Sequence, residues 1–416
     1  MNAVILTIGD EILIGQVVNT NAGFIGERLA GAGVPIREVI TVGDDRAEIL
    51  RGLDQACAVA GLVIATGGLG PTHDDVTKRA VAEYFGLSLV ADPLLHDRIR
   101  ALLSSRNIPW GPAAGEQAMV PAGAVVLPNR YGTAPGFVIE RAGTTVVVLP
   151  GVPCEMEQIM TDSVLPIVSE RMNREPGGAA IFHRTLRTTG ISESSLSTLI
   201  GAPDSIPPGV KLAFLPSLSG VRLRLDAVGP GPEAERRLDA AERMIREKAG
   251  RHLYATGDEE LESVVGRLLA SKGLTIACAE SCTGGSVSRK ITSVPGSSRY
   301  FLGGVVAYSD ALKESLLGVP RPTLAAHGAV SKETALAMAS GIRAAAGADI
   351  GVSTTGIAGP SGGTPEKPVG LVWIACADSR GAVAVRQTYG EGRDRVVERA
   401  TFSALELVRR RLLDLE

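Results

Sequence analysis

Short apolar runs alternate with helix-like segments along residues 1–170, and this alternation constrains the fold more than any other feature of the sequence. Runs typical of strands lie at Ala3–Ile8, Ile36–Val42, Leu62–Thr66, 125–127, 136–139 and 144–149. Apolar side chains recur at helical spacing over residues 22–29, 47–60 and 153–171. A β-α-β order places successive strands in parallel and covers both faces of the sheet with helices. We therefore predict an α/β domain with a parallel sheet.

A smaller unit follows at residues 171–255. Apolar and charged side chains alternate over 221–226, which is typical of a half-exposed strand. Residues 233–249 carry a helical pattern that ends at Gly250. This combination predicts a small α+β domain, which resembles the KH-like middle piece of some multidomain bacterial proteins. It contains no basic GxxG loop, so a spacer role is favoured.

A third unit is predicted over residues 256–416. The spacing of Thr256 and Glu259 predicts a capping box at the start of a helix that ends at Gly273. Strand-like runs then lie at 274–279, 304–307, 350–354, 370–375 and 382–389. A terminal helix is predicted over 395–413. This order indicates a second α/β domain.

The composition limits the classes of partner. Lys and Arg total 42 and Asp and Glu total 45, so the net charge is −3, and aromatic residues make up only 4%. Proteins that coat nucleic acids are typically more basic and use aromatic side chains to stack on bases. Five cysteines without a CxxC pair fit a reducing compartment. With no leader pattern and no membrane-spanning run, we expect a cytoplasmic protein that binds neither membranes nor nucleic acid directly.

The first candidate site is the Gly-rich segment 66–77, which follows a strand and precedes a helix. Three glycines would let a ligand approach the backbone, namely Gly67, Gly68 and Gly70. N–H groups at the start of a helix attract anions such as phosphate, and Thr72 lies at this position. A plain turn capped by Thr72 or Asp74 is an alternative, and Lys78 is interpreted as a solvated helix lysine.

Acidic residues accompany this segment. Asp74 and Asp75 are adjacent, and a second carboxylate beside a phosphate is unfavourable without a cation such as Mg²⁺. Two more acidic loops, 9–11 and 43–45, end strands of the same predicted sheet, where ligands of parallel sheets bind. The sequence thus predicts a metal-assisted pyrophosphate site. Its candidate metal ligands are Glu11, Asp44, Asp74 and Asp75.

These motifs resemble a known family. Segments 9–21, 42–45, 66–77, 128–137 and 149–156 are similar to the amino-terminal domain of the CinA family, which in turn resembles MoaB/MogA-type molybdopterin-binding proteins. The resemblance implies an ADP-ribose pyrophosphatase activity that needs a divalent metal ion.

The second candidate site is the segment 279–285, which follows a strand and precedes a helix predicted at 285–292. A hydroxyl at Ser281 would gain from the helix N-terminus, and N–H groups of Gly284 and Gly285 could bind an oxyanion. Cys282 is a rival nucleophile.

A serine nucleophile needs a base. His327 is the only histidine in this unit, but no acidic partner stands out. Lys313 is the alternative, with Tyr308 as a relay. A lysine starts at a pKa of about 10.4 and must lose about three units to act near pH 7, through burial or a cationic neighbour such as Arg393. A surface lysine is the plain interpretation of Lys313.

Two further Gly-rich loops, 354–363 and 367–370, suggest a nucleotide pocket that includes Gly356, Gly359 and Gly362. Together with AESCTGG, the segments 295–309 and 327–331 and both loops resemble the CinA carboxy-terminal domain. This domain also occurs alone as a nicotinamide-mononucleotide amidohydrolase. The resemblance implies that Ser281 is the nucleophile, that Tyr308 and Lys313 activate it, and that Thr355 and Arg393 belong to the site.

The leading interpretation is a bifunctional pyridine-nucleotide recycling enzyme. It would hydrolyse nicotinamide mononucleotide without a cofactor and ADP-ribose with a divalent metal ion, and a homodimer is expected. The alternative is a molybdopterin-like ligand-binding protein, or a scaffold for competence or DNA repair, without catalysis.

Overall fold

The structure, a computed structural model, describes residues 1–416 apart from 71–74, 142, 175–179, 203–204, 391 and 416. The described chain divides into two packed units. The first joins Met1–His183 with Ala227–Glu235, and the second joins Arg184–Asp226 with Arg236–Glu416. No helix in this described part of the chain has both the length and the hydropathy that crossing a membrane requires.

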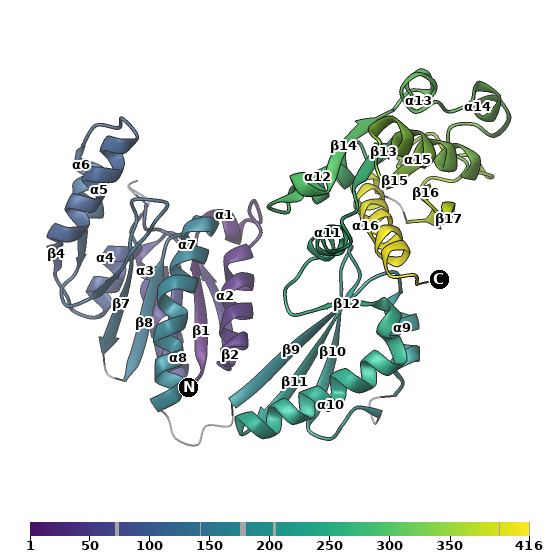
Figure 1. The fold of residues 1–416 in the computed structure, drawn as a ribbon. Helices are drawn as coiled ribbons and strands as arrows, with labels where there is room; N and C mark the ends of the chain where they lie inside the picture. The colour runs from purple at the N-terminus through teal and green to yellow at the C-terminus, as the bar shows by residue number, and fades with distance from the viewer. Residues whose placement is uncertain (71–74, 142, 175–179, 203–204, 391, 416) are drawn as a thin grey trace. The chain divides into compact units, whose positions relative to one another are not determined.

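The first unit is built on a six-stranded sheet (Figure 1) with the order β2-β1-β3-β8-β7-β6. Its strands are β1 (Ala3–Ile8), β2 (Ile36–Val42), β3 (Leu62–Thr66), β6 (Val125–Leu127), β7 (Gly136–Arg141) and β8 (Thr144–Leu149). Strands β2, β1, β3 and β8 run parallel, and β7 pairs antiparallel with both β8 and β6. The predicted parallel sheet is confirmed for these four strands, and β7 runs opposite to the other strands of the sheet.

Helices cover both faces of this sheet, because successive side chains of the buried strand β1 point to opposite faces. Ile5 lies in one hydrophobic cluster with Ile25, and Leu6 lies in the other with Leu53. The helices are α1 (Asp10–Leu13), α2 (Thr20–Gly31), α3 (Arg46–Val59), α4 (Thr77–Tyr84), α7 (Pro153–Ile159) and α8 (Leu165–Arg174). A π-helical turn, Met160–Val164, interrupts the single helix predicted at 153–171.

A helical arm between α4 and β6 was not predicted. It consists of β4 (Leu89–Ala91), α5 (Pro93–Ser105), α6 (Pro112–Gln117) and β5 (Met119–Pro121). The strands β4 and β5 pair with each other in a separate two-stranded sheet. Leu95, Ile99 and Val120 form a small core of their own. The sequence signal is weak here because this core is too small to give a long apolar pattern.

The middle domain has a four-stranded sheet with the order β10-β11-β9-β12. Its elements are β9 (Ala180–Thr188), α9 (Glu193–Ile200), β10 (Val210–Pro216), β11 (Val221–Gly229), α10 (Gly231–Ala249) and β12 (Leu253–Thr256). Burial alternates along β11, and Leu238, Ala241 and Ile245 of α10 are fully buried. The predicted half-exposed strand and amphipathic helix are confirmed.

The C-terminal domain is a five-stranded sheet with the order β14-β13-β15-β16-β17. Its strands are β13 (Ile276–Glu280), β14 (Phe301–Val306), β15 (Ile350–Gly356), β16 (Leu371–Asp378) and β17 (Gly381–Thr388). The first three of these run parallel, and β16 pairs antiparallel with both β15 and β17. Three helices share one hydrophobic core with the sheet, namely α11 (Leu261–Lys272), α12 (Ser286–Thr292) and α16 (Arg393–Leu412). Three other helices pack with other side chains of the sheet in separate clusters, namely α13 (Asp310–Leu317), α14 (Arg321–His327) and α15 (Lys332–Ala346).

The capping box predicted at Thr256 is wrong. Helix α11 begins after Glu260, and Thr256 is the last residue of β12. The Thr256 hydroxyl donates to Glu242 instead (3.1 Å), while Glu259 binds Arg267 (3.0 Å). Both side chains of the expected box therefore have other partners.

A buried ion pair connects the last helix to the end of the middle domain. Arg409 is 2% exposed and binds Glu406 through Nε (2.7 Å). It also donates to the carbonyl of Arg251 (2.6 Å). Arg409 is therefore a structural residue of the interior and not part of a solvated basic cluster.

Removing this guanidinium should destabilise the protein strongly. We expect Arg409→Met to lower the free energy of unfolding of this unit by about 3–5 kcal/mol, because Glu406 is left as a buried charge without its partner. The double variant Arg409→Met with Glu406→Leu should recover most of the loss, since both charges are then absent. Urea unfolding followed by circular dichroism measures both, and equal losses in the two variants would contradict the assignment.

Candidate active sites

The acidic loops of the first unit meet at the carboxyl ends of β1 and β2. The N–H of Asp10 donates to Asp44 Oδ2 (3.0 Å), and the N–H of Asp44 donates to Asp10 Oδ1 (3.3 Å). A pocket of about 330 Å³ lies beside them and is lined by Glu11, Asp44 and Asp75, among others. The predicted convergence of acidic loops at this edge is therefore present in the structure.

The carboxylates at this pocket repel one another. Burial raises the pKa of Asp44, and the negative charges of Glu11, Asp10 and Asp75 raise it further. A cation would relieve this repulsion, so the donor set suits a divalent metal ion in charge and in its oxygen chemistry. Within the described residues, no three His, Cys, Asp or Glu side chains form a ready-made metal cluster. Asp74 and Thr72, both predicted to take part, lie outside the described residues.

The glycines of this loop have roles in the backbone conformation and its hydrogen bonds. A Cβ at Gly67 would collide with the carbonyl oxygen of Ile8, and φ is +116° there, so glycine is required. The N–H of Gly67 donates to Leu149 (3.2 Å), and the N–H of Gly70 donates to Asp75 Oδ1 (2.7 Å). A ligand that approaches the backbone at Gly67 and Gly70 therefore meets N–H groups that the protein itself already binds.

Among the described residues, two buried oxygens beside this pocket have no hydrogen-bond partner. They are Asn21 Oδ1, from a residue that lines the pocket, and Thr77 Oγ1, which lies next to Gly68. Buried polar atoms are nearly always paired, so such orphans mark places where a ligand or water completes the site. This favours a polar ligand in the pocket.

Lys78 is not a solvated helix lysine, contrary to the interpretation of the sequence. Its ammonium donates to the carbonyls of Glu116 (3.0 Å) and Gln117 (3.3 Å) at the end of α6. Burial lowers its pKa to about 8. Lys78 therefore fixes the arm to α4.

The second candidate site lies at the carboxyl ends of β14, β13 and β15. Glu280 pairs with Val306 on one side and with Thr354 on the other. Ser281, Ala307 and Thr355 therefore follow at the same edge of the sheet. Ser281 is 8% exposed, and its N–H donates to the carbonyl of Thr354 (3.0 Å).

Lys313 is buried at this edge. Its side chain is 1% exposed, and Nζ donates to the backbone carbonyl of Tyr308 (3.1 Å). Burial lowers the pKa of Lys313, and Asp310, whose Oδ1 lies 3.8 Å from Nζ, opposes the shift. The charge of Lys313 also lowers the pKa of Cys282, the residue that follows Ser281. The plain interpretation of Lys313 as a surface lysine is wrong.

Tyr308 and Arg393 form a second pair. Arg393 Nη2 donates to the phenol oxygen of Tyr308 (3.3 Å), and Nη1 donates to the carbonyl of Gly359 (3.0 Å). The phenol thus bonds to Arg393, while Lys313 bonds to the backbone of Tyr308. Direct proton transfer from Ser281 to Lys313 and a relay through the phenol of Tyr308 both stay predictions.

The rivals of Ser281 and Lys313 are poorly placed. Burial raises the pKa of Cys282 to about 12, so its thiol is neutral near pH 7. His327 is exposed and faces Glu333 (3.8 Å). Neither environment favours a thiolate–imidazole pair.

Glu280 is a buried residue of this site that sequence reasoning missed. Its carboxylate is 1% exposed and accepts hydrogen bonds from the N–H groups of Gly285 (2.9 Å), Val287 (3.1 Å) and Ser288 (2.8 Å). The expectation that these helix N–H groups serve Ser281 is wrong, because Glu280 takes them. An acidic residue shortly before a helix start was the available signal.

The other predicted glycines have mixed roles. Gly284 donates its N–H to Ser281 O (3.2 Å), so neither Gly284 nor Gly285 offers a free oxyanion donor. Gly356 pairs with Val372 in the sheet, and Gly359 supplies the carbonyl that holds Arg393. Gly362 adopts a positive φ of +90° in the loop beyond.

Thr355 ties this loop region together. Its hydroxyl is buried and donates to the carbonyl of Ala329 (2.7 Å). Lys367 Nζ donates to the carbonyl of His327 (2.7 Å), close to Gly328. The 327–329 segment is therefore held from two sides.

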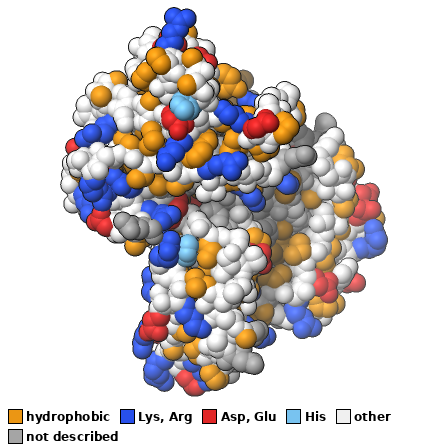
Figure 2. All heavy atoms as spheres, turned by 90° about the vertical axis from the view of Figure 1, so that its right-hand side faces the viewer, with side chains coloured by type: hydrophobic (Ala, Val, Ile, Leu, Met, Phe, Trp, Pro, Cys, Tyr) orange, Lys and Arg blue, Asp and Glu red, His pale blue; other side chains and the backbone are white. Residues whose placement is uncertain are grey.

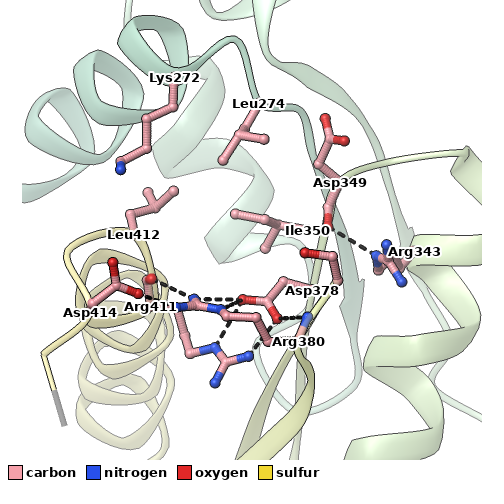
Figure 3. Close-up of a pocket in the computed structure, with 11 residues that line it drawn as sticks. Lys272, Leu274, Arg343, Asp349, Ile350, Asp378, Arg380, Arg411, Leu412 and Asp414 are labelled. Carbon is pink, nitrogen blue, oxygen red and sulfur yellow. Dashed lines mark hydrogen bonds and ion pairs between the residues drawn. The ribbon is translucent and has the colours of Figure 1, made fainter.

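An ion network occupies the opposite edge of the same sheet (Figure 3). Arg380 and Arg411 both bind the carboxylate of Asp378, at 2.7 Å for Arg380 Nη2 and 3.1 Å for Arg411 Nε. Asp349 accepts from the N–H (2.8 Å) and hydroxyl (2.7 Å) of Thr275. The cavity between them has about 210 Å³. Because these charges are matched within the protein, the network fixes the turn after β16 against the end of α16.

Basic side chains on the face drawn in Figure 2 lie in separate groups interrupted by hydrophobic and acidic side chains. In the middle domain, Arg184 binds Asp239 (2.6 Å) and Glu242 (3.0 Å), and Arg246 binds Glu242 (2.7 Å). Arg184 of β9 and Arg246 of α10 are therefore matched locally by acidic residues of α10.

Comparison with known proteins is consistent along the whole chain. A model described as "Probable molybdopterin binding domain" matches residues 4–170, the damage-inducible protein CinA KH domain matches 183–255, and the CinA C-terminal domain matches 258–412. The CinA-like protein of Salinibacter ruber is 47% identical over 414 residues, covering 99% of this chain and 100% of the relative. That of Chloroherpeton thalassium is 45% identical, covering 98% and 99%.

A solved CinA structure from Thermoplasma acidophilum is 37% identical and covers 40% of this chain and 97% of that chain, with a TM-score of 0.38. The close relatives and the three family models agree with the resemblance drawn from the sequence motifs. The chain belongs to the CinA family.

Proposed function

We propose that the C-terminal domain hydrolyses the carboxamide of nicotinamide mononucleotide to nicotinate mononucleotide and ammonia. The observation that carries the proposal is the buried amine of Lys313, which binds the Tyr308 carbonyl just beyond β14, beside the end of β13 that Ser281 follows. Burial lowers the pKa of Lys313 and so favours the neutral amine, which is the form a general base needs.

In the proposed reaction, Ser281 Oγ attacks the amide carbon while its proton moves to Lys313 Nζ. The tetrahedral intermediate then collapses, and Lys313 returns the proton to the leaving nitrogen, which departs as ammonia. Water hydrolyses the resulting ester with Lys313 again as the base. One water is consumed for each amide cleaved, and no metal ion takes part.

Arg393 is proposed to hold the phosphate or the oxyanion. It lies at the start of α16 and already bridges Tyr308 and the loop of Gly359. Its two hydrogen bonds leave other N–H groups of the guanidinium for a ligand.

Acid quench during turnover, followed by peptide mass spectrometry, tests this scheme. We expect an acyl adduct on the peptide segment at Ser281, with the mass of the acid product less one water. An adduct carried by Cys282 would overturn the scheme.

For the N-terminal domain we propose a metal-dependent ADP-ribose pyrophosphatase. Glu11, Asp44 and Asp75 would hold a divalent cation, with Asp74 as a further candidate. When bound, the cation would act as a Lewis acid toward phosphoryl oxygens. Asp75 is held by the N–H of Gly70, which fixes its carboxylate toward the pocket edge. The support is the charge repulsion at Asp44 and the orphaned oxygens beside the pocket.

Asp44→Asn should abolish metal-dependent release of AMP from ADP-ribose. It should also remove the rise in Tm that Mg²⁺ or Mn²⁺ causes, which corresponds to about 2.7 kcal/mol at a hundredfold excess over Kd. Asp97→Asn, whose carboxylate is 81% exposed, is the matched control and should behave as wild type. An unchanged metal-induced rise in Asp44→Asn would remove Asp44 from the ligand set.

We further propose a cytoplasmic homodimer that binds these small nucleotides and neither membranes nor nucleic acid directly. Analytical ultracentrifugation of the full chain tests the dimer, and a single monomer peak across micromolar concentrations would contradict it.

A further inference from the structure

We propose that Glu280 is a positioning residue that makes Ser281, and not the adjacent Cys282, the nucleophile of the C-terminal site. The inference rests on the proposed amidase function and extends it to the choice between two rival side chains.

The turn after β13 presents two nucleophiles side by side. Ser281 is 8% exposed and Cys282 is 6% exposed, so neither is excluded by burial alone. A thiolate is intrinsically the stronger nucleophile, and N–H groups at a helix start or nearby cations promote its formation. A serine enzyme with this arrangement needs a device that keeps the thiol protonated.

Glu280 removes the first influence that promotes a thiolate, the N–H groups at the helix start. Five donors converge on its carboxylate, from the N–H groups of Gly285, Val287 and Ser288 and the hydroxyls of Thr283 and Ser288. The helix N–H groups that could stabilise a thiolate are therefore occupied by a carboxylate of the same sign.

Glu280 also opposes the second influence that promotes a thiolate, the nearby cations. The positive charges of Arg393 and Lys313 lower the pKa of Cys282, whereas the charge of Glu280 raises it and adds to the larger effect of burial. Tyr389, whose own pKa is raised mainly by burial and also by Cys282, is a further titratable neighbour among the described residues. Without the carboxylate, two cations would act on Cys282 with less opposition.

The same carboxylate shapes the turn. Gly284 and Gly285 adopt positive φ values of +61° and +100°, and the turn closes through the bond from Gly284 N–H to Ser281 O. Because all five partners of Glu280 are donors, an amide at this position would turn its NH₂ toward at least one of them. A glutamine therefore cannot reproduce the arrangement.

The test uses Glu280→Gln in the full chain. We expect kcat for ammonia release to fall at least about tenfold with a small change in KM, and alkylation of Cys282 by iodoacetamide at pH 8 to become about tenfold faster, the effect of one pKa unit. Peptide mass spectrometry assigns the alkylated cysteine, and Cys282→Ala provides the blank. A merely structural role would not speed alkylation in a folded variant.

Glu262→Gln is the matched control, because Glu262 is a buried carboxylate of the same domain with one partnered oxygen, bound to Lys290 (3.0 Å). It should leave both readouts unchanged. If Glu280→Gln does not fold, Ser288→Ala removes one donor to Glu280 Oε1 and should move both readouts in the same direction by a smaller factor.

Cys282 alkylation at the wild-type rate in a folded Glu280→Gln or Ser288→Ala protein overturns the inference. Alkylation needs no turnover. If the wild-type chain releases no ammonia, the proposed amidase function is contradicted, and this result is independent of the alkylation rates.

Discussion

Ser281→Ala is expected to reduce ammonia release from nicotinamide mononucleotide by about 10³-fold or more. Without the nucleophile the covalent intermediate cannot form, and the reaction must use a much slower route. KM should change little, since the alanine keeps the turn and removes only the hydroxyl. A coupled assay for ammonia at saturating substrate measures the loss.

Cys282→Ala is the control for the first variant. With a pKa of about 12 the thiol is neutral, so its removal should leave kcat within a few-fold of wild type. A loss in Cys282→Ala comparable to that in Ser281→Ala would transfer the nucleophile to the cysteine.

Lys313→Met should lower kcat by about 10²–10⁴-fold, the usual contribution of a positioned general base. Methionine keeps an unbranched side chain and removes only the amine. Lys332→Met, an exposed lysine at the start of α15, is the matched control and should keep full activity. Full activity of Lys313→Met would exclude the amine from catalysis.

The pH dependence of kcat follows from the lowered pKa of Lys313. Below its lowered pKa, Lys313 is protonated and cannot accept the serine proton, so kcat should rise with pH through that pKa. Stability should also rise with pH between the lowered folded pKa and the unfolded value of about 10.4, because the unfolded chain binds more protons in that window. Lys313→Met should remove this part of the slope.

Much of the fold followed from the sequence because the strands are short, apolar and separated by helical periods. Strands β1, β2 and β3 begin and end where the pattern predicts. The meeting of Asp10 with Asp44 also followed, since strand ends of a parallel sheet share an edge by topology alone.

The detail of both sites did not follow from the sequence, because it depends on which groups the folded backbone already uses. Gly67 and Gly70 have the expected conformational freedom, yet their N–H groups bind Leu149 and Asp75. The N–H of Gly285 is likewise bound by Glu280. Motif patterns record residue types and do not record hydrogen-bond partners.

The burial of Lys313 was equally hidden from the sequence. Its helix, α13, is only eight residues long, too short for a clear periodic pattern to separate its inner face from its outer face. The packing of α13 against the later helix α15 is not recorded in this short segment.

The most direct test of the account is ammonia release from nicotinamide mononucleotide by the purified full chain in excess chelator. We expect ammonia release to continue at the rate seen without chelator, and nicotinate mononucleotide to form in an amount equal to the ammonia. Absence of ammonia, or release that stops with the chelator and returns with added metal, would contradict it.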